Sequence, residues 1–176
     1  NAEKIIQYLE NRPVVSVSLV VCNKAGAGVL DIAARFGIKT LLIGKSQFEN
    51  SNEYIQVLKN EGITHIVLAG FLWKIPENLV RAYNNKIVNI HPALLPAFGG
   101  KGMYGEKVHQ AVINAGEKKS GITIHLVDEH YDNGKTLFQA TVEVLSTDNP
   151  ETLAEKIHTL EHAHYPKVIA EWLKVK

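Results

Sequence analysis

The sequence has little cysteine and no long apolar run. Cys22 is its only cysteine, which excludes an intramolecular disulfide framework and fits a reducing compartment. Because Cys22 lies inside an apolar run, a small core residue is the simplest interpretation. No apolar stretch approaches the roughly 20 residues of a membrane helix, and the N-terminus lacks the basic-then-apolar pattern of a signal peptide. We therefore expect a cytoplasmic protein that neither spans nor docks on a membrane.

An excess of charge of either sign is also missing. The chain has 19 Lys and Arg against 18 Asp and Glu, so no overall field favours nucleic acid or an anionic membrane. An anionic substrate must instead be bound by local groups. We find no internal repeat, low-complexity tract or linker, and 176 residues with 45% hydrophobic side chains suit one domain over residues 1–176.

Alternating strand and helix patterns predict the fold class. An amphipathic helix starts at once behind Asn1 as its N-cap. The expected strands of the first half are 14–22, 38–43, 63–69 and 86–90, and the expected helices are 26–36, 49–60 and one that begins near Pro76. This order is typical of a three-layer α/β fold, with a mostly parallel, twisted, Rossmann-like sheet and helices on both faces.

The second half has a different pattern. Residues 105–115 are expected to be helical, and 121–127 and 136–144 to be strands. Asp132-Asn133-Gly134 between these strands has turn chemistry, which predicts an antiparallel hairpin. Asn149 and Pro150 then open a long C-terminal helix.

Two polar segments are expected beyond the carboxyl ends of strands, where open α/β sheets bind ligands. In the first, Asn89 and His91 are two residues apart on one strand, so both side chains face the same side. The alternative is that Asn89 caps the strand and His91 makes a local hydrogen bond. In the second, Thr123, His125 and Val127 precede an acidic loop, 128–134, which could instead be a solvated hairpin turn.

Together, these segments resemble the folate-dependent formyltransferase family. The resemblance is carried by Asn89-Ile90-His91-Pro92-Ala93-Leu94-Leu95-Pro96 and, downstream, by Asp132-Asn133-Gly134. It extends to residues 68–75, 121–125 and 161–166, and covers nearly the whole chain in the expected order. The implied architecture is the formyltransferase variant of the Rossmann-like fold.

The resemblance also implies an activity. Formyl would pass from 10-formyltetrahydrofolate, as co-substrate, to the amine of glycinamide ribonucleotide in de novo purine biosynthesis, without a metal. Acyl transfer of this kind needs oxyanion donors and a proton shuttle. Asn89 and His91 can stabilise the tetrahedral oxyanion, and His91 can act as general acid. Asp132 joins them through the resemblance, and would support the imidazolium and position a water in a proton relay.

Binding residues follow from the resemblance as well. Those expected to bind the folate are Leu72, Trp73, Lys74, Ile75, Val127 and Asp128. Those expected to bind the acceptor are Asn1, His158 and Glu161. Asn1 resembles the last residue of a glycine-rich phosphate turn, so we expect an apolar strand and most of that turn to precede the printed sequence.

Other interpretations remain open. The acceptor could be a nucleotide sugar, an aminoacyl-tRNA or water, and the fold could be a non-catalytic nucleotide-binding module. His158, Glu161 and His162 fit an H-x-x-E-H zinc pattern, but such a site needs a third protein ligand. The glycine-rich segment 97–105 could be a mobile lid or a solvated connection, and Lys101 within it could assist phosphate binding. Both a monomer and a homodimer are compatible with the sequence.

Overall fold

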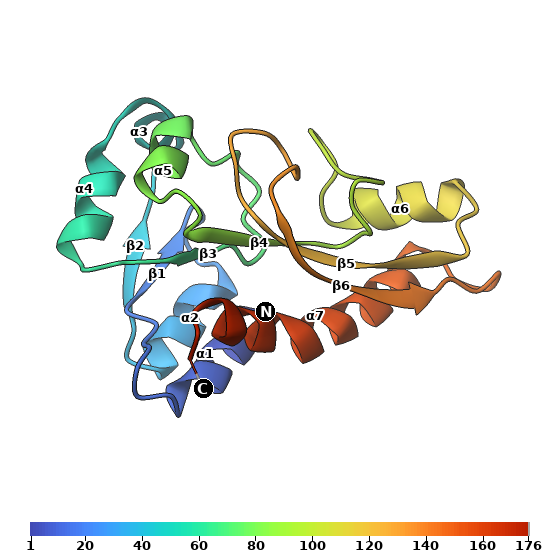
Figure 1. Ribbon diagram of the computed structural model, residues 1–176, viewed down its shortest axis with the longest axis horizontal. Coiled ribbons are helices and arrows are strands. Elements are labelled where there is room, and N and C mark those ends of the chain that lie inside the picture. Colours follow the sequence, from blue (N-terminus) through green and yellow to red (C-terminus); the bar gives the residue numbers. More distant parts are fainter. Residues whose placement is uncertain (176) are drawn as a thin grey trace.

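Helices and strands alternate along the computed structural model, which describes residues 1–175 (Figure 1). The strands are β1 (Leu19–Cys22), β2 (Lys39–Leu42), β3 (Ile66–Val67), β4 (Ile87–His91), β5 (Lys119–Leu126) and β6 (Thr136–Glu143). The helices are α1 (Ala2–Glu10), α2 (Gly28–Arg35), α3 (Lys45–Asn50), α4 (Glu53–Asn60), α5 (Glu77–Ala82), α6 (Glu106–Asn114) and α7 (Pro150–Trp172). The α/β class predicted from the sequence is confirmed.

The strands form two sheets, of which one is parallel and the other is of mixed direction. Parallel strands β1 and β2 make one sheet, and the other has the order β3-β4-β5-β6. In the larger sheet β3 and β4 are parallel, whereas β4–β5 and β5–β6 are antiparallel. The expected hairpin is therefore present as β5–β6. The larger sheet differs from the mostly parallel sheet that was expected, because its two longest strands, β5 and β6, pair in antiparallel direction.

Alternate side chains of β4 belong to two different hydrophobic cores. Val88 and Ile90 belong to a core with α1 and α7, whereas Ile87 belongs to a second core with α3, α4 and α5. Because side chains alternate across a strand, these cores lie on opposite faces of β4, with helices on both sides (Figure 1). Asn89 and His91 share the face of Ile87, away from α7.

Helix α7 is fixed at its start and in its second half. Asn149 and Thr152 form a capping box at its first turn, and the helix begins where the sequence predicted it. Tyr165 is fully buried, and its hydroxyl donates to the Leu68 carbonyl at 2.8 Å. The Val88 carbonyl lies 3.2 Å from the same hydroxyl oxygen. These contacts tie α7 to Leu68, directly after β3, and to Val88 near the start of β4. Among the described residues, no helix has both the length and the apolar character needed to cross a membrane.

Three predicted elements differ from those in the structure. The expected strand 14–22 is reduced to β1, because β2 offers only four residues for pairing. The expected helix 49–60 is two helices, α3 and α4, since extended Ser51 interrupts them and its hydroxyl accepts from the Glu53 N–H. The expected strand 63–69 is only β3, whose pairing with β4 covers two residues.

Gly121 in β5 makes an unusually close approach to β6, which predicts a large effect on stability. A Cβ at Gly121 would lie 2.0 Å from the Ala140 carbonyl oxygen. We expect Gly121→Ala to lower the free energy of unfolding by about 2–3 kcal/mol, and the Tm by roughly 4–12 °C. Gly28→Ala in α2 is the matched control, because a Cβ there meets nothing within 4 Å. Equal Tm values for the two variants in a thermal unfolding experiment would contradict the prediction.

Candidate active site

Strand pairing assembles a cluster of four polar side chains, which we call the polar cluster: Asn89, His91, His125 and Asp132. Asn89 lies directly opposite His125 in the β4–β5 pair. Asn89 Nδ2 is 3.3 Å from His125 Nε2, and His125 Nε2 is 3.6 Å from Asp132 Oδ1. Asp132 Oδ2 in turn lies 3.6 Å from His91 Nδ1. The structure thus brings together the three residues chosen from the sequence.

His125 is the member that the sequence analysis placed on a strand but gave no role. It is 2% exposed, and it links Asn89 to Asp132. The signal that could have found it is the antiparallel pairing itself: once β4 and β5 are aligned, the residue opposite Asn89 is His125. Cross-strand neighbours have Cβ atoms only about 5 Å apart.

Backbone carbonyls fix the proton positions on both imidazoles. A carbonyl can only accept, so the 2.8 Å contact from His125 Nδ1 to the Leu126 oxygen puts a proton on Nδ1. In the neutral ring Nε2 then accepts from Asn89, which keeps its second amide N–H for another partner. His91 Nε2 likewise donates to the Phe98 carbonyl at 2.8 Å. Nδ1 of His91 is therefore the nitrogen that titrates, and it faces Asp132.

Asp132 is held as a carboxylate. Burial raises its pKa, but the neighbouring His125 imidazole, the hydrogen bond from the Gly100 N–H and the charge of His91 outweigh burial and lower the pKa below its ordinary value. The Gly100 N–H donates to Asp132 Oδ2 at 2.9 Å. The separation from His91 Nδ1 is 3.6 Å, which leaves no room for a water between the two atoms. A relaying water must therefore bind beside the pair.

Burial dominates the pKa of His91. The side chain is 3% exposed, and its desolvation lowers the pKa below the ordinary value of 6.5. Asp132 and the hydrogen bond to Phe98 act in the opposite direction, but they do not compensate. Asp132 thus favours the imidazolium, as expected from the sequence, while the resting ring is neutral at pH 7. Negative charge that develops next to Nδ1 would favour its protonation.

The glycine-rich segment 97–105 contacts the polar cluster through its backbone. The Phe98 carbonyl accepts from His91, and the Gly100 N–H donates to Asp132. Both residues have positive φ, 56° and 97°, which is easily accommodated only at Gly100. In this structure the segment therefore lies against the reacting groups, whereas Lys101 is exposed.

Residues expected to bind the folate lie on two segments of the chain, 72–75 and 127–128. Leu72 is 58% exposed, whereas Ile75 is buried in the core with α5. Trp73 packs against Phe48 and Phe71, with ring centroids 5.9 and 5.8 Å away. Lys74 Nζ lies 5.7 Å from the centroid of the Tyr131 ring, which links this segment to the loop that carries Asp132.

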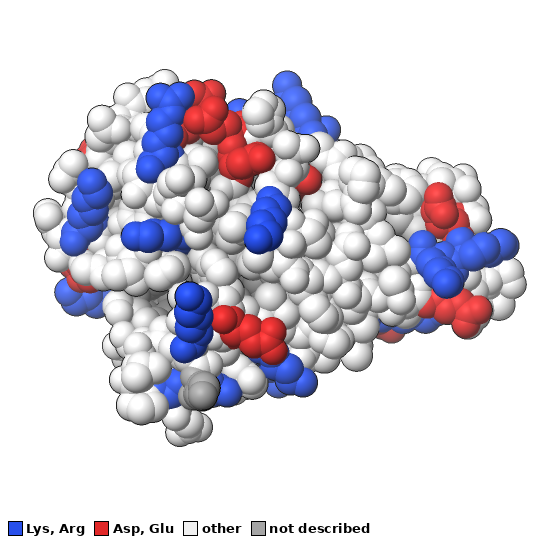
Figure 2. Space-filling view, viewed as in Figure 1, with Lys and Arg blue, Asp and Glu red and all other residues white. Residues whose placement is uncertain are grey.

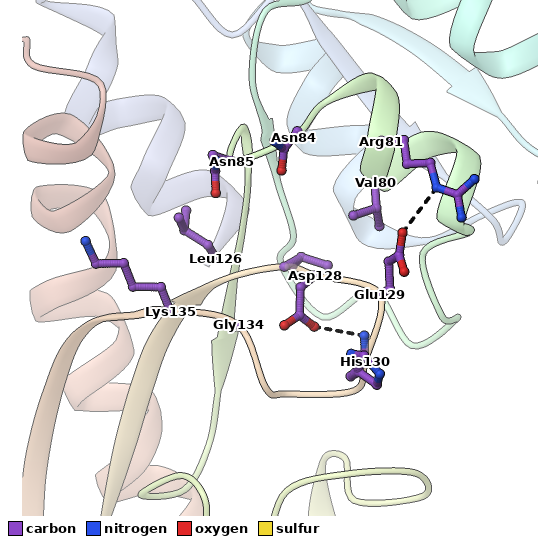
Figure 3. Close-up of a pocket in the computed structure, with 11 residues that line it drawn as sticks. Val80, Arg81, Asn84, Asn85, Leu126, Asp128, Glu129, His130, Gly134 and Lys135 are labelled. Atoms are coloured by element: carbon purple, nitrogen blue, oxygen red, sulfur yellow. Dashed lines mark hydrogen bonds and ion pairs between the residues drawn. The ribbon is translucent and has the colours of Figure 1, made fainter.

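A cavity of about 600 Å³ lies between α5 and the loop after β5 (Figure 3). Two residues expected to bind the folate, Val127 and Asp128, line it. Its lining includes an Arg81–Glu129 ion pair of 3.2 Å and Asp128, which accepts from the His130 N–H. None of the polar cluster and none of residues 72–75 lines this cavity. Lys74 borders a separate hollow of about 380 Å³.

The residues expected to bind the acceptor lie at α7. Asn1 Nδ2 donates to Glu161 Oε2 at 2.7 Å, and Glu161 is 6% exposed. His158 is exposed nearly one turn before Glu161, and its ring stacks on that of His162 with centroids 6.4 Å apart. Within residues 1–175, no group of three or more His, Cys, Asp or Glu side chains is arranged to hold a metal ion.

Basic and acidic side chains are interspersed on the face shown in Figure 2, with broad uncharged areas between them. This distribution agrees with the near-zero net charge. The face therefore presents no large patch of one sign.

The buried histidines predict a pH dependence of stability. Burial lowers the pKa values of His91 and His109 below 6.5, so the unfolded chain binds more protons near pH 6 than the folded one. Their contribution is fully present above pH 6.5 and is lost as the pH falls through the lowered pKa values. We expect the Tm to fall between about pH 7.5 and 5, and the slope to be shallower in His109→Gln. An identical slope in this variant would contradict the assignment to His109.

Comparison with known proteins identifies the family. The family model described as "Formyl transferase" matches residues 1–169. The chain belongs to this family. Within it, a phosphoribosylglycinamide formyltransferase of Bacillus subtilis is 38% identical over 178 residues, covering 98% of this chain and 89% of that protein. The chloroplastic enzyme of the same name from Arabidopsis thaliana is 46% identical over 158 residues.

Similarity to solved structures supports the same family membership. The crystal structure of phosphoribosylglycinamide formyltransferase from Bacillus halodurans has a TM-score of 0.87 and 35% identity, covering 98% of this chain and 89% of that one. The formyltransferase fold is thereby confirmed. The chain spans about half the length of two plant relatives, 54% of the Arabidopsis thaliana protein and 50% of the Vigna unguiculata one.

Proposed function

We propose that this chain transfers the formyl group of 10-formyltetrahydrofolate to the amine of glycinamide ribonucleotide. The observation that carries the proposal is the polar cluster, in which Asn89, His91 and Asp132 are linked through His125. Its support is membership of the formyl transferase family, with relatives named phosphoribosylglycinamide formyltransferase.

The cluster can meet the needs of the reaction. The acceptor amine attacks the formyl carbon, a C–N bond forms, and the carbonyl oxygen becomes an oxyanion. The free amide N–H of Asn89 and Nδ1 of His91, once protonated, are the donors for this oxyanion. Collapse of the intermediate breaks the bond to N10 of the folate, which leaves with the proton that His91 delivers as general acid.

Asp132 acts through His91 in this mechanism. Its carboxylate lies 3.6 Å from His91 Nδ1 and favours the imidazolium as the oxyanion develops. The Gly100 N–H keeps this carboxylate in place. The amine must also lose a proton, which a water bound beside Asp132 would relay to Nδ1 of His91, so that His91 holds the proton that it then delivers to N10. The lowered pKa of Asp132 keeps it charged throughout.

Binding of the two substrates is assigned to different parts of the fold. For the folate we propose Leu72, Trp73, Lys74, Ile75, Val127 and Asp128. For the acceptor we propose Asn1, His158 and Glu161. The folate residues lie on the two segments that the Lys74–Tyr131 contact joins, and the acceptor residues lie at α7. A flat heteroaromatic ring and a phosphorylated sugar would thus approach the polar cluster from separate sides.

The deciding experiment measures formyl loss from 10-formyltetrahydrofolate with and without glycinamide ribonucleotide. Loss that depends on the acceptor, with formation of the formylated product, is the expected result. Loss without acceptor would indicate a formylfolate hydrolase. No loss in either case would indicate a nucleotide-binding module without this chemistry.

The proposal also covers the compartment, the partners and the oligomeric state of the enzyme. The single buried cysteine suits the cytoplasm, the compartment we propose, because free thiols persist under reducing conditions. Its partners are then small molecules rather than nucleic acid, and a monomer and a homodimer both fit. Light scattering on the eluting protein would distinguish these two states.

A further inference from the structure

Thr123 holds the chain that follows the reacting strand, and every hydrogen-bonding site of its hydroxyl is used for this. The residue is fully buried in β5, directly opposite His91 in the β4–β5 pair. Its Oγ1 donates to the Ala93 carbonyl at 2.7 Å, and accepts from the Leu95 N–H at 2.9 Å and from Gln139 Nε2 at 2.8 Å. Because a hydroxyl has one donor and two acceptor sites, none is left for a substrate.

Gln139 binds the other main-chain group of Leu95. It lies opposite Thr123 in the β5–β6 pair, and its Nε2 also donates to the Leu95 carbonyl at 3.1 Å. Side chains from two neighbouring strands thus bind both the N–H and the carbonyl of Leu95. We call Thr123 and Gln139 the strand clamp. Since the clamp binds Leu95 at both groups, it fixes the orientation of the peptide planes on either side of this residue.

The side chain of Leu95 transmits this constraint to segment 97–105. A Cβ placed on Gly99 would lie 2.5 Å from Leu95 Cδ2 and 3.4 Å from Asp132 Cβ. The backbone of Gly99 therefore packs between these two side chains. The residues on either side of Gly99 make the main-chain contacts with His91 and Asp132 described above. A continuous path of contacts thus leads from the strand clamp to the reacting groups.

The Phe98 carbonyl at the end of this path determines where His91 carries its proton. It accepts from Nε2 at 2.8 Å, so the neutral ring leaves Nδ1 free to take up the proton that the water beside Asp132 relays. Without this acceptor the neutral ring has two tautomers, and the one with its proton on Nδ1 cannot accept there. The position of the ring matters as well, because a misplacement of about 1 Å can cost about 10²-fold in rate.

We propose that the two residues of the strand clamp are positioning residues for formyl transfer, which hold the Phe98 carbonyl against His91 and thereby keep the proton of the neutral ring on Nε2. The inference rests on the proposed function, because it explains how the same His91 is prepared for its part in the reaction. It adds β6, through Gln139, to the elements that serve the reacting groups.

Substitutions at Thr123 test the hydroxyl directly. Thr123→Val removes the hydroxyl at nearly constant shape, whereas Thr123→Ser retains it. We expect Thr123→Val to lower kcat by about 10- to 100-fold, with little change in KM for either substrate, and Thr123→Ser to stay close to the parent. Ser120→Ala is the matched control, because Ser120 is buried in the same strand but its hydroxyl has no hydrogen-bond partner among residues 1–175.

Two kinetic results would overturn the inference. The first is a parent-like kcat in a folded Thr123→Val protein. The second is an equal loss of kcat in Thr123→Val and Thr123→Ser, because such a loss would follow the shape of the side chain rather than the hydroxyl.

Gln139→Leu provides a test if Thr123→Val folds poorly. Gln139 is exposed, so its substitution should leave the fold intact. The variant loses the donors to Thr123 and Leu95, and we expect kcat to fall by about 10-fold, as for the loss of ordinary hydrogen bonds. A parent-like kcat in Gln139→Leu would remove this residue from the clamp.

The tautomer of His91 can be measured without turnover, which separates this inference from the proposed function. Long-range ¹H–¹⁵N spectra of protein labelled with ¹⁵N-histidine, at a pH where His91 is neutral, should show only the Nε2-protonated ring in the parent and in Thr123→Ser. Thr123→Val should show a mixture with the Nδ1-protonated ring. The signals of His91 are those missing from the spectrum of His91→Ala.

The two measurements together distinguish the possible failures. A single Nε2-protonated ring in Thr123→Val would overturn the inference even in an active enzyme. A parent protein that transfers no formyl group would overturn the proposed function, whereas the spectra would still decide whether the strand clamp sets the proton of His91.

Discussion

His91→Ala is expected to lower kcat by about 10²- to 10⁴-fold, the usual contribution of a general acid. The variant loses the Nδ1 proton for the folate nitrogen, and it loses one of the two donors for the oxyanion. His91 acts on the oxyanion and on the leaving nitrogen, and Asn89 remains as the second oxyanion donor. KM values for both substrates should therefore change much less than kcat. Steady-state kinetics with each substrate varied in turn would measure this.

Two further measurements define the role of His91. Its position is 3% exposed, so circular dichroism and the Tm must show that His91→Ala folds. Asp132→Asn keeps the shape of the carboxylate but removes its charge, and should also reduce kcat more than affinity. Parent-like turnover in a folded His91→Ala protein would contradict the mechanism.

Asn89→Ala is expected to lower kcat by about 10²- to 10³-fold, as removal of an oxyanion donor does elsewhere. Among residues 1–175, only one N–H of its amide has a partner, in the 3.3 Å contact with His125 Nε2. The other is available to the oxyanion, which exists only along the reaction path. The effect should therefore fall on kcat rather than on either KM.

Asn89→Asp tests whether donation matters. It is nearly the same size but has no N–H, and a carboxylate would repel an oxyanion, so its rate should be at least as low as that of Asn89→Ala. Near-parent activity in Asn89→Asp would show that the side chain only fills space. His125→Asn should have a smaller effect, because it removes the partner of Asn89 while leaving both proposed donors.

The sequence predicted the elements whose patterns are local. A cap such as Asn149 before α7 depends on neighbouring residues, and the structure confirms it. The hairpin of β5 and β6 is also present, but the residue with positive φ in its loop is Asp132 rather than Asn133 or Gly134. The extents of β1 and β3 depend on the partner strand, which periodicity does not reveal. For this reason residues 14–18 of the expected first strand are outside β1 in the structure.

Only part of the candidate site could be predicted from the sequence, because only some of its contacts are local. Asn89 and His91 share a face through the two-residue repeat of a strand, which is a local property. Asp132 came from family resemblance, because its approach to His91 depends on the path of a loop. His125 required the β4–β5 register, and the covering of His91 by Phe98 required the conformation of residues 97–105. Such contacts are set by tertiary structure rather than by spacing.

Segment 97–105 contacts His91 and Asp132 through main-chain atoms, the carbonyl of Phe98 and the N–H of Gly100. The polar cluster therefore depends on the path of this segment rather than on the chemistry of its side chains. Over generations, exchanges of side chain should be tolerated here at many positions. Insertions or deletions between Pro96 and Gly100 would instead move both main-chain partners at once, so we expect conserved length with variable composition.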